Sequence, residues 1–346
     1  MPLAPNFFER AIFLTFNQGP GVTLDLWGGP AFRIVLAAIR LNIFETLTAN
    51  PLTANDLAQR LNLDLRGARI LLDTLTALGY LKEEGDQFAN SAMTHKWLTD
   101  SGDINFSPYF RFWGDVLEKL WPWLEESFRS GQPPVHLYQW IEGQPETSRH
   151  FQEGMIAIAR YVGVSVARAL PLPPDARRVL DIGGGHAAYS IALCRQHPQL
   201  TAVVFDSPQA LVTGQRLIVA ENMAGQVSVQ AGDLMVDDLG TGYDAALLFN
   251  IIHGFLPDQN LALLQKAARA LNPGGMIAIL EQLPDSAPLP LANALAHILS
   301  VSYFHLLGGQ IYPYEEIAGW LHASGFSNVR RKNLLRGGST LITAVK

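Results

Sequence analysis

The chain has 346 residues, of which 48% are hydrophobic and 16% are charged, and this composition excludes an intrinsically disordered chain. Its net charge of −6 comes from 25 basic and 31 acidic residues without a basic block, which argues against nucleic acid as a partner. The one cysteine, Cys194, excludes an intramolecular disulfide and is expected in the core, and we expect a cytoplasmic protein without a secretory leader or membrane span.

The first 29 residues mix aromatic residues with glycine and proline. A short amphipathic helix is expected there, and an apolar arm of this kind rarely stays exposed to water. We therefore expect the arm to pack on a second subunit. Its apolar face would comprise Phe7, Phe8, Ile12, Phe13 and Leu14.

The next segment predicts three helices and a β-hairpin, which is the order of a winged helix. A helical period over 31–48 is followed by two helices, over 54–61 and 65–78, and by a hairpin over 80–88. Thr53 and Asp64 are the expected N-caps of these two helices, and Gly79 is expected to end the second.

A winged helix often binds DNA, but the charge of this one argues against that function. Residues 51–90 contain four basic and six acidic residues, a net charge of −2, whereas DNA affinity depends mainly on neutralised phosphates. The helix in the recognition position carries an apolar packing face. We favour a role in dimerisation or as a substrate lid, and a winged-helix regulator remains an alternative. The packing face comprises Ile70, Leu71, Leu72, Leu75 and Leu78.

The middle of the chain predicts long helices rich in aromatic residues. One helix is expected over 106–129 and another over 147–170, and the proline-rich stretch 171–174 is expected to be a linker. Most of these aromatic side chains should lie in the core, while a few should line an apolar pocket for a flat ligand. The sequence thus predicts an N-terminal arm with a winged helix (1–100), a helical substrate-pocket region (101–172) and a C-terminal domain (173–346).

Strand and helix patterns alternate in the C-terminal domain, which is typical of a parallel sheet covered by helices on both faces. The last two strands are close enough in sequence to form a hairpin, so one strand should be antiparallel. We predict an α/β fold with a Rossmann-like, doubly wound sheet. The expected strands are 178–182, 202–205, 227–231, 245–249, 276–281, 329–333 and 340–344.

The most informative stretch is VLDIGGGHAAYS, residues 179–190. A buried strand, three consecutive glycines at 183–185 and a helix form the nucleotide-binding corner of a doubly wound sheet. The glycine pattern alone is weak, and a turn that binds nothing is the alternative. Two acids strengthen the pattern. Asp181 stands where a cationic amino group would bind, and Asp206 ends the next strand at the spacing typical of a ribose ligand.

In their order along the chain, the motifs resemble those of the S-adenosylmethionine-dependent small-molecule O-methyltransferases, the family of plant caffeate and flavonoid enzymes and many bacterial ones. The resemblance covers essentially the whole chain. It implies S-adenosyl-L-methionine as cofactor, S-adenosyl-L-homocysteine as product, a small-molecule acceptor and a homodimer formed through the N-terminal domain. No metal is expected, because the histidines form no carboxylate-rich cluster of ligand spacing. The resemblance rests on VLDIGGGHAAYS, VVFDSPQAL, AGDLM, FNIIHGFLPD, LNPGGMIAILEQ and ASGF.

The resemblance also implies roles for individual residues. His253, after the fourth strand, would be the general base, and Glu281, at the end of the fifth strand, would be an acid that flanks it. The cofactor would be bound by Asp181 at its methionine end, Gly183 and Gly185, Asp206 and Ser207 at its ribose, and Asp233 and Leu234 at its adenine. The acceptor would be contacted by Phe112, Trp113, Phe151, Met155, Ile158, Ser302 and His305.

The implied chemistry suits these residue types. A phenol keeps its proton near neutral pH, with a pKa of about 10, so a histidine within hydrogen-bond reach can remove it. A carboxylate on the other ring nitrogen would fix the tautomer and stabilise the imidazolium. The alternative for His253 is a structural histidine at a strand end.

The chain departs from the family pattern beside the histidine. Residues 254–255 are Gly-Phe where Asp-Trp is frequent, Phe249 stands where a polar residue is frequent, and Ile311 stands where a second acid is expected. His305 or Gln310 would have to replace the second acid beside His253. C-methylation or other cofactor-assisted chemistry therefore remains an alternative. A nicotinamide dehydrogenase is a weaker one, because the acid before the glycines and the AGDLM segment fit a sulfonium cofactor better.

Overall fold

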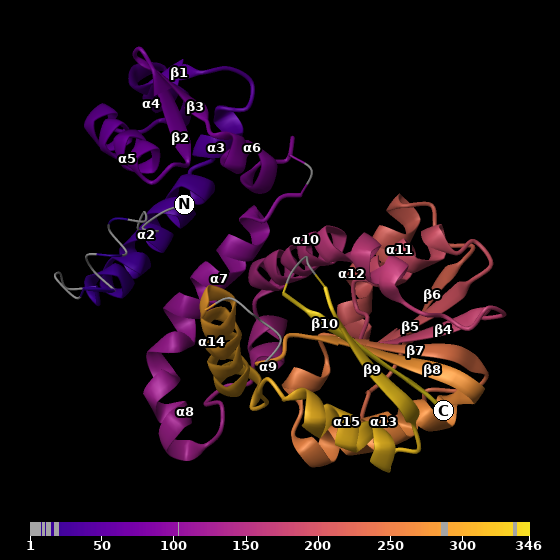
Figure 1. Cartoon of the computed structure of the whole chain (residues 1–346). Helices are drawn as coiled ribbons and strands as arrows, with labels where there is room; N and C mark the ends of the chain where they lie inside the picture. The colour runs from indigo at the N-terminus through magenta and orange to yellow at the C-terminus, as the bar shows by residue number, and fades with distance from the viewer. Residues whose placement is uncertain are drawn as a thin grey trace. The chain divides into compact units, whose positions relative to one another are not determined.

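The structure is a computed structural model that describes residues 21–102, 104–284, 290–334 and 338–346, together with residues 8, 11, 15 and 16. The chain divides into two compact units, Met1–Leu117 and Glu118–Lys346 (Figure 1). The expected three-part division at residues 100 and 172 stays a prediction. Most of the expected N-terminal helix, with Phe7, Ile12, Phe13 and Leu14, lies outside the described residues.

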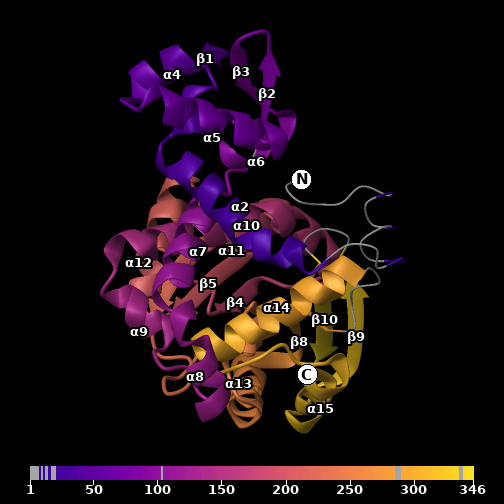
Figure 2. The ribbon, with the colours of Figure 1, turned by 90° about the vertical axis from the view of Figure 1, so that its left-hand side faces the viewer.

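The first unit contains the helices and the hairpin of the predicted winged helix (Figure 2). Its three short strands pair antiparallel in the order β1-β3-β2. The elements are helices α2 (Thr23–Arg40), α3 (Ile43–Thr46), α4 (Ala54–Leu61), α5 (Leu65–Ala77) and α6 (Ala92–Leu98), and strands β1 (Leu52–Thr53), β2 (Leu81–Glu84) and β3 (Gln87–Asn90). Helix α7 (Ser107–Lys119) follows them.

Local sequence signals define most boundaries in this unit. The side chain of Thr53 accepts a hydrogen bond from the backbone N–H of Asp56, and Asp64 caps α5 in the same way, so both predicted caps are confirmed. The single helix predicted over 31–48 is wrong. Asn42 adopts a left-handed conformation with φ of 57°, which interrupts the helical hydrogen bonds and separates α2 from α3.

The core of the first unit forms beneath α5 and the hairpin. Leu72 and Leu75 of α5 are fully buried against Leu57 and Phe88, so the predicted packing face is confirmed at these positions. At Ile70 the prediction is wrong, because that side chain is 57% exposed.

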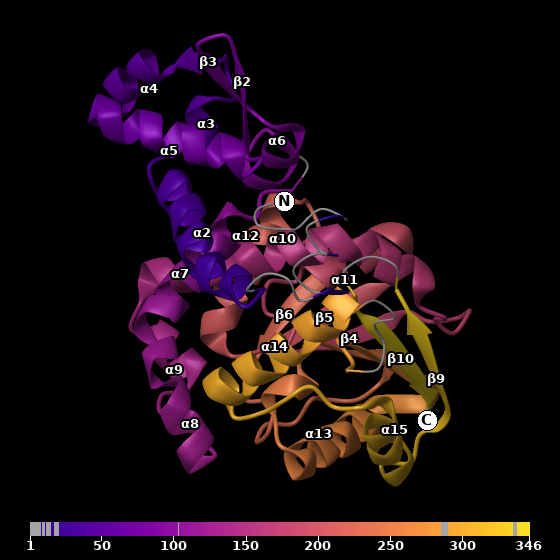
Figure 3. The same cartoon turned by 60° about the vertical axis from the view of Figure 1, so that its left-hand side comes forward.

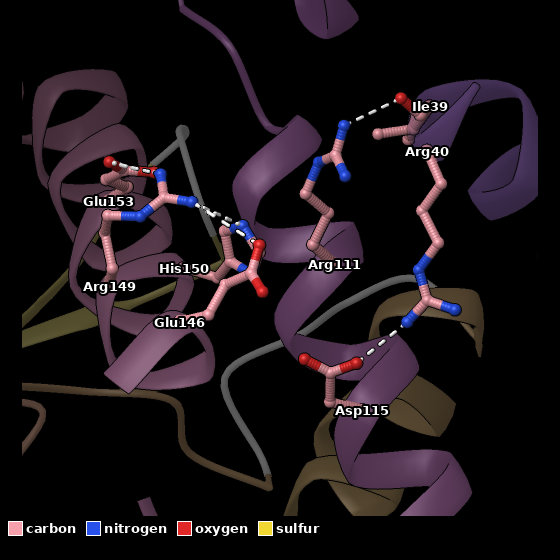
Figure 4. Close-up of polar contacts among 8 residues, drawn as sticks. All are labelled: Ile39, Arg40, Arg111, Asp115, Glu146, Arg149, His150 and Glu153. Atoms are coloured by element: carbon pink, nitrogen blue, oxygen red, sulfur yellow. Dashed lines mark hydrogen bonds and ion pairs between the residues drawn. The ribbon is translucent and has the colours of Figure 1, made fainter. Parts of the chain in front are cut away.

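Polar contacts join α2 to α7 within the first unit (Figure 4). The Arg40 guanidinium lies 2.8 Å from the Asp115 carboxylate, and Arg111 donates a hydrogen bond of 2.8 Å to the carbonyl oxygen of Ile39. A side chain at Gly114 would overlap the end of the Leu36 side chain, so a larger residue where the two helices meet would displace Leu36.

The second unit is built around a seven-stranded sheet in the order β6-β5-β4-β7-β8-β10-β9. Strand β10 is antiparallel to both neighbours and the other pairs are parallel, which confirms the predicted mostly parallel sheet with one antiparallel strand. The strands are β4 (Arg178–Ile182), β5 (Thr201–Asp206), β6 (Val227–Ala231), β7 (Tyr243–Phe249), β8 (Leu271–Glu281), β9 (Ser327–Asn333) and β10 (Thr340–Val345).

Helices cover both faces of this sheet (Figures 1 and 3). Alternate residues of β4 face opposite cores: Val179 packs with the residues of α10 and α11, and Leu180 packs with those of α13 and α15. Cys194 of α11 is fully buried, as predicted, and burial raises the pKa of its thiol to about 11. The helices are α8 (Leu124–Ser130), α9 (Leu137–Glu142), α10 (Pro145–Ala169), α11 (Ala188–Gln196), α12 (Pro208–Ala220), α13 (Pro257–Ala270), α14 (Pro290–Leu307) and α15 (Tyr314–Ala323).

The helical region differs from its prediction around Pro122, and it also contains α9, a helix that was not predicted. The single helix expected over 106–129 is wrong, because α7 ends at Lys119 and a 3-10 turn, Trp121–Trp123, precedes α8. Pro122 lies in this turn and has no N–H to continue a helix. The later helix is confirmed as α10, whose surface carries Arg149 between Glu146 and Glu153 (Figure 4). No helix in the described part of the chain has the length and hydropathy needed to cross a membrane.

Candidate active site

Four motifs meet at one edge of the sheet because β4, β5, β7 and β8 are parallel. The glycine turn 183–185 follows β4, Asp206 ends β5, the 3-10 turn η3 (Ile252–Gly254) follows β7, and Glu281 ends β8. Strand β4 lies between β5 and β7, so the chain connections leave in opposite directions on its two sides. Ligands of doubly wound sheets bind at such a point.

The glycine turn is shaped by its own surroundings. Gly183 has φ of 74°, and a Cβ there would overlap Ile251. A Cβ at Gly184 would overlap the carboxylate of Asp181, and one at Gly214 of α12 would overlap the carbonyl oxygen of Gly185. Packing within the protein therefore accounts for these glycines, and the assignment of a ligand depends on the acids around them.

Asp206 ties the glycine turn to β5. One carboxylate oxygen accepts the backbone N–H of Gly185 at 2.9 Å, and the other accepts that of Ser207 at 2.7 Å. Burial raises the pKa of Asp206, and these two hydrogen bonds lower it. Each oxygen retains a second lone pair that a hydroxyl group of a ligand can use.

Asp181 lies beneath the turn and is 1% exposed. Its Oδ2 accepts a hydrogen bond of 2.6 Å from the hydroxyl of Ser190, while Oδ1 is buried and has no partner among the described residues. Burial raises the pKa of this carboxyl to about 6, although the Ser190 hydrogen bond opposes the shift. The structure thus shows Asp181 bonded to α11 and packed against Gly184, and the contact with a cationic amino group stays a prediction.

The other predicted cofactor residues border the turn or cap local structure. A side-chain carbon of Leu234 lies 3.5 Å from where a Cβ of Gly183 would be, so Leu234 is beside the turn. The carboxylate of Asp233 is occupied by the backbone N–H of Met235 at 2.7 Å, and the hydroxyl of Ser207 caps α12. Sequence reasoning missed Lys266, which donates to the carbonyl oxygen of Leu234 at 2.6 Å.

His253 and Glu281 form a buried pair at this edge. Nδ1 of His253 lies 2.8 Å from Oε2 of Glu281, and the two residues are 8% and 2% exposed. Because a carboxylate only accepts, Nδ1 is the donor, and Nε2 of the neutral ring is then the free acceptor. Nε2 has no hydrogen-bond partner in the described ranges, and the side chain keeps 10% of its surface exposed. This arrangement suits a general base.

Contacts that sequence reasoning missed hold the His253 loop. Asn260 of α13, which is fully buried, donates to the carbonyl oxygens of Ile252 at 2.9 Å and Phe255 at 3.2 Å. Tyr312 donates to Phe255 at 2.6 Å. A Cβ at Gly309 would overlap the backbone of His253. In the sequence, Asn260 could have been noticed in one way: it is a polar residue on the buried side of the predicted helix that became α13.

Tyr303 of α14, also missed, covers the ring of His253. The two ring centroids lie 3.7 Å apart and the ring planes are 8° from parallel. The Tyr303 hydroxyl donates to Oε1 of Gln282 at 3.3 Å.

The residues suggested to replace the second acid do not do so. Both ring nitrogens of His305 are occupied, Nδ1 by the hydroxyl of Ser127 at 2.7 Å and Nε2 by the carbonyl oxygen of Leu120 at 3.1 Å, so compensation by His305 is wrong. Gln310 is exposed, and Ile311 is buried. The base is therefore paired with one carboxylate.

The predicted acceptor contacts are distributed over both units. Phe112 and Trp113 belong to the first unit, where they pack around Tyr109. The other five lie in the second unit, and that all seven share a pocket stays a prediction. Among these five, the hydroxyl of Ser302 bonds to its own helix, Phe151 packs edge-to-face on Tyr138, and Met155 and Ile158 are half-buried, while the contacts of His305 are those given above.

Family comparisons decide the class of protein. Residues 122–327 match the model of the O-methyltransferase domain, and residues 31–100 match the model of the O-methyltransferase dimerisation domain. The chain belongs to the O-methyltransferase family. Members use S-adenosylmethionine, so this protein is an S-adenosylmethionine-dependent methyltransferase, and the dehydrogenase and regulator alternatives are not supported.

Individual relatives cover nearly the whole chain. The chain is 32% identical to 3-hydroxy-5-methyl-1-naphthoate 3-O-methyltransferase of Streptomyces sahachiroi, over 90% of each chain. It is 31% identical to the tetracenomycin polyketide synthesis 8-O-methyl transferase TcmO of Streptomyces glaucescens, over 91% of this chain and 94% of the relative. It is 29% identical to L-tyrosine C(3)-methyltransferase of Streptomyces lavendulae, over 89% and 86%.

A solved structure supports the same family and fold. An O-methyltransferase family protein from Burkholderia thailandensis superposes with a TM-score of 0.81 at 26% identity, and the match covers 94% of this chain and 98% of the other. For the described residues, no group of three or more histidine, cysteine or acidic side chains is arranged to hold a metal ion.

Proposed function

We propose that this O-methyltransferase transfers the methyl group of S-adenosylmethionine to a hydroxyl group of a small aromatic or polyketide-like molecule, with His253 as general base. The observation that carries the proposal is the hydrogen bond between His253 Nδ1 and Glu281 Oε2, which leaves Nε2 for the acceptor. Two of the relatives are named for O-methylation of a naphthoate and of a polyketide product, which supports this acceptor class.

The proposed reaction needs one proton transfer. Bound S-adenosylmethionine supplies a methyl group that its sulfonium charge already activates. As the hydroxyl oxygen of the acceptor bonds to the methyl carbon and the carbon–sulfur bond breaks, His253 Nε2 takes the hydroxyl proton. The products are a methyl ether and S-adenosylhomocysteine. Glu281 holds the tautomer and stabilises the imidazolium until the proton passes to water.

The proposed cofactor site lies at the glycine corner. Asp206 would bind the ribose hydroxyls through the second lone pairs of its oxygens, with Ser207 beside it. The proposal also places Asp181 at the methionine end, Gly183 and Gly185 along the cofactor, and Asp233 with Leu234 at the adenine. Asp181 and Asp233 each use one carboxylate oxygen for an internal hydrogen bond, and Oδ1 of Asp181 has no partner among the described residues. No metal is required.

We also propose a homodimer formed through the N-terminal domain. The match to the dimerisation domain over residues 31–100 supports it. Large apolar side chains on or next to α2 are exposed, which is unusual for a surface in water. They are Val22, Leu26 and Trp27.

A second candidate reaction is methylation of an aromatic carbon. One relative is named as a C-methyltransferase, and Ile311 stands where the family has a second acid beside the base. Methylation of carbon uses the same cofactor and still requires removal of a proton, so the fold alone does not distinguish the two.

The cofactor part is tested by calorimetric titration with S-adenosylmethionine and S-adenosylhomocysteine. Wild type should bind both, and Asp206→Ala should bind them about tenfold to hundredfold more weakly, because it loses hydrogen bonds to a charged group. Absence of binding to the wild type would overturn the proposed function.

The acceptor part is tested with a panel of hydroxylated naphthoates and phenols, beginning with 3-hydroxy-1-naphthoate. Mass spectrometry detects the added methyl group, and NMR of the product places it. A methyl group on oxygen is the expected result. A methyl group on carbon would select the second candidate instead.

A further inference from the structure

The imidazole of His253 is held at one atom and on one face. Glu281 contacts Nδ1 at the ring edge, and Tyr303 lies flat against the ring with centroids 3.7 Å apart and planes 8° from parallel. A hydrogen bond at one atom still permits the ring to tilt about it. An aromatic face in contact with the ring removes that freedom, so the two contacts together define the direction of Nε2.

Hydrogen bonds at the ends of β7, which His253 follows, and of β8, which Glu281 ends, also hold Tyr303. Its hydroxyl donates to Gln282, the residue after Glu281. The amide of Gln282 in turn donates to the side-chain oxygen of Asn250, directly after β7, at 3.3 Å and to the hydroxyl of Ser339 at 3.2 Å. Tyr303 is therefore hydrogen-bonded to the same edge of the sheet at which His253 lies.

Among the described residues, the acid bonded to the base is Glu281. Proton transfer to His253 creates an imidazolium inside a largely buried site. The face of a tyrosine ring attracts a cation, and this attraction is stronger when water is excluded.

We propose that Tyr303 is a positioning residue for the base: its ring fixes the plane of His253 so that Nε2 points at the acceptor, and the face of the ring stabilises the imidazolium that forms. The role in proton transfer rests on the proposed function, whereas the fixed ring plane does not. Two measurements separate these parts.

The first measurement is NMR of the full chain loaded with S-adenosylhomocysteine and labelled at its histidine side chains. The His253 signals are identified by their absence in His253→Asn. In the wild type they should show a ring-current shift to higher field and a single tautomer with protonated Nδ1. Tyr303→Phe should keep both properties, and Tyr303→Leu should lose the shift and broaden or average the ring nitrogen signals.

The second measurement is steady-state kinetics with the member of the hydroxynaphthoate panel that is turned over. Tyr303→Leu should lower kcat about tenfold while the KM of the acceptor and the affinity for S-adenosylhomocysteine stay within about twofold. Tyr303→Phe should stay within about threefold of the wild type, because it keeps the stacked ring. A purely structural contribution would lower the affinity or the folded fraction instead.

Phe304→Leu is the matched control. Phe304 is the next residue of α14 and also stacks on an aromatic ring, that of Phe128, with centroids 5.6 Å apart. It should leave both the His253 signals and kcat unchanged. The proposal is overturned if Tyr303→Leu leaves the His253 signals unchanged or keeps the wild-type kcat, or if Phe304→Leu has the same effects. Failure of every acceptor in the panel counts against the proposed function, and the NMR result still decides whether Tyr303 fixes the ring.

Discussion

The glycine corner and the base loop lie at the same edge of one sheet, but the chain builds them differently. The corner is contiguous: strand, turn and helix occupy residues 178–196, and the turn bonds to Asp206 of the adjacent strand. The base loop, which is the His253 loop after β7 with the residues that contact it, combines distant segments of the chain. These residues include Glu281, Tyr303 and Asn260. A short motif can specify the first region, whereas only tertiary packing specifies the second.

One buried acid from each region, Asp181 and Glu281, shows the same difference. Asp181 and Glu281 are both almost fully buried, and each has one oxygen bonded and the other buried without a partner among the described residues. The partner decides the function. Asp181 receives a hydroxyl group from Ser190 of α11 and lies against Gly184, while Glu281 faces an imidazole that can accept a proton. Burial alone does not distinguish the two acids, and the roles proposed for them depend on their partners.

The largest expected effect is that of His253→Asn. Asparagine can still donate a hydrogen bond to Glu281, but it cannot take the acceptor proton, so kcat should fall about a thousandfold. The rate is measured with saturating S-adenosylmethionine and the panel acceptor. If the variant kept more than a tenth of the wild-type kcat, His253 would not be the residue that accepts the hydroxyl proton.

Asp181→Asn should change how stability depends on pH. Burial raises the pKa of Asp181 to about 6 from the ordinary value of 3.8, so the folded state holds this proton more tightly than the unfolded state. The contribution of Asp181 to stability is therefore lost as pH rises from about 4 to about 6, and is constant above. Relative to Asp181→Asn, the wild type should lose about 3 kcal/mol of unfolding free energy over that range.

Urea unfolding at several pH values measures this difference. Asparagine keeps the volume of the side chain and can still accept the Ser190 hydrogen bond, so effects other than ionisation should not vary with pH. A difference between wild type and variant that is flat from pH 4 to pH 7 would contradict the assignment of Asp181 as a buried acid with a raised pKa.

Glu281→Gln should lower kcat by about a hundredfold, less than the loss of His253 itself. Glutamine can keep a hydrogen bond to the ring, but it has no charge to stabilise the imidazolium and no longer selects one tautomer. The affinity for S-adenosylhomocysteine, measured by calorimetry, should not change. If kcat stayed at the wild-type value, the comparison between the two acids would fail.

Gly184→Ala has the smallest expected effect, a loss of about 2 kcal/mol of stability, because the new methyl group would overlap the buried carboxylate of Asp181. Gly225→Ala is the control, since nothing lies within 4 Å of the position of its Cβ. Thermal unfolding of both variants measures the difference. Equal stability of the two would show that the turn accommodates a side chain.

The sequence predicted those features whose causes are local. Thr53 and Asp64 cap the helices that follow them. The central strands were recovered because burial on both faces leaves a continuous apolar pattern, and the antiparallel strand was expected because the last two strands are close enough in sequence to form a hairpin. The breaks at Asn42 and Pro122 were missed, since helical periodicity continues across both.

For the site, the sequence predicted the residues that lie at strand ends and missed those that arrive by packing. The family resemblance named His253 and Glu281, and the structure brings them together because the carboxyl ends of the parallel strands β7 and β8 meet at one edge of the sheet. Tyr303, Asn260 and Gly309 gave no comparable signal, because each reaches the base loop from a helix or turn remote in sequence.

We propose that the glycine corner binds the cofactor and that the His253 loop removes the proton, and that either function can be lost without the other. The most direct test measures two quantities on His253→Asn and Asp206→Ala: the Kd of S-adenosylhomocysteine, and the single-turnover rate of methyl transfer at saturating cofactor. We predict that His253→Asn keeps the wild-type Kd within about twofold and loses the rate, while Asp206→Ala loses affinity. Equal losses of affinity in both variants, or a wild-type rate in His253→Asn, would contradict the account.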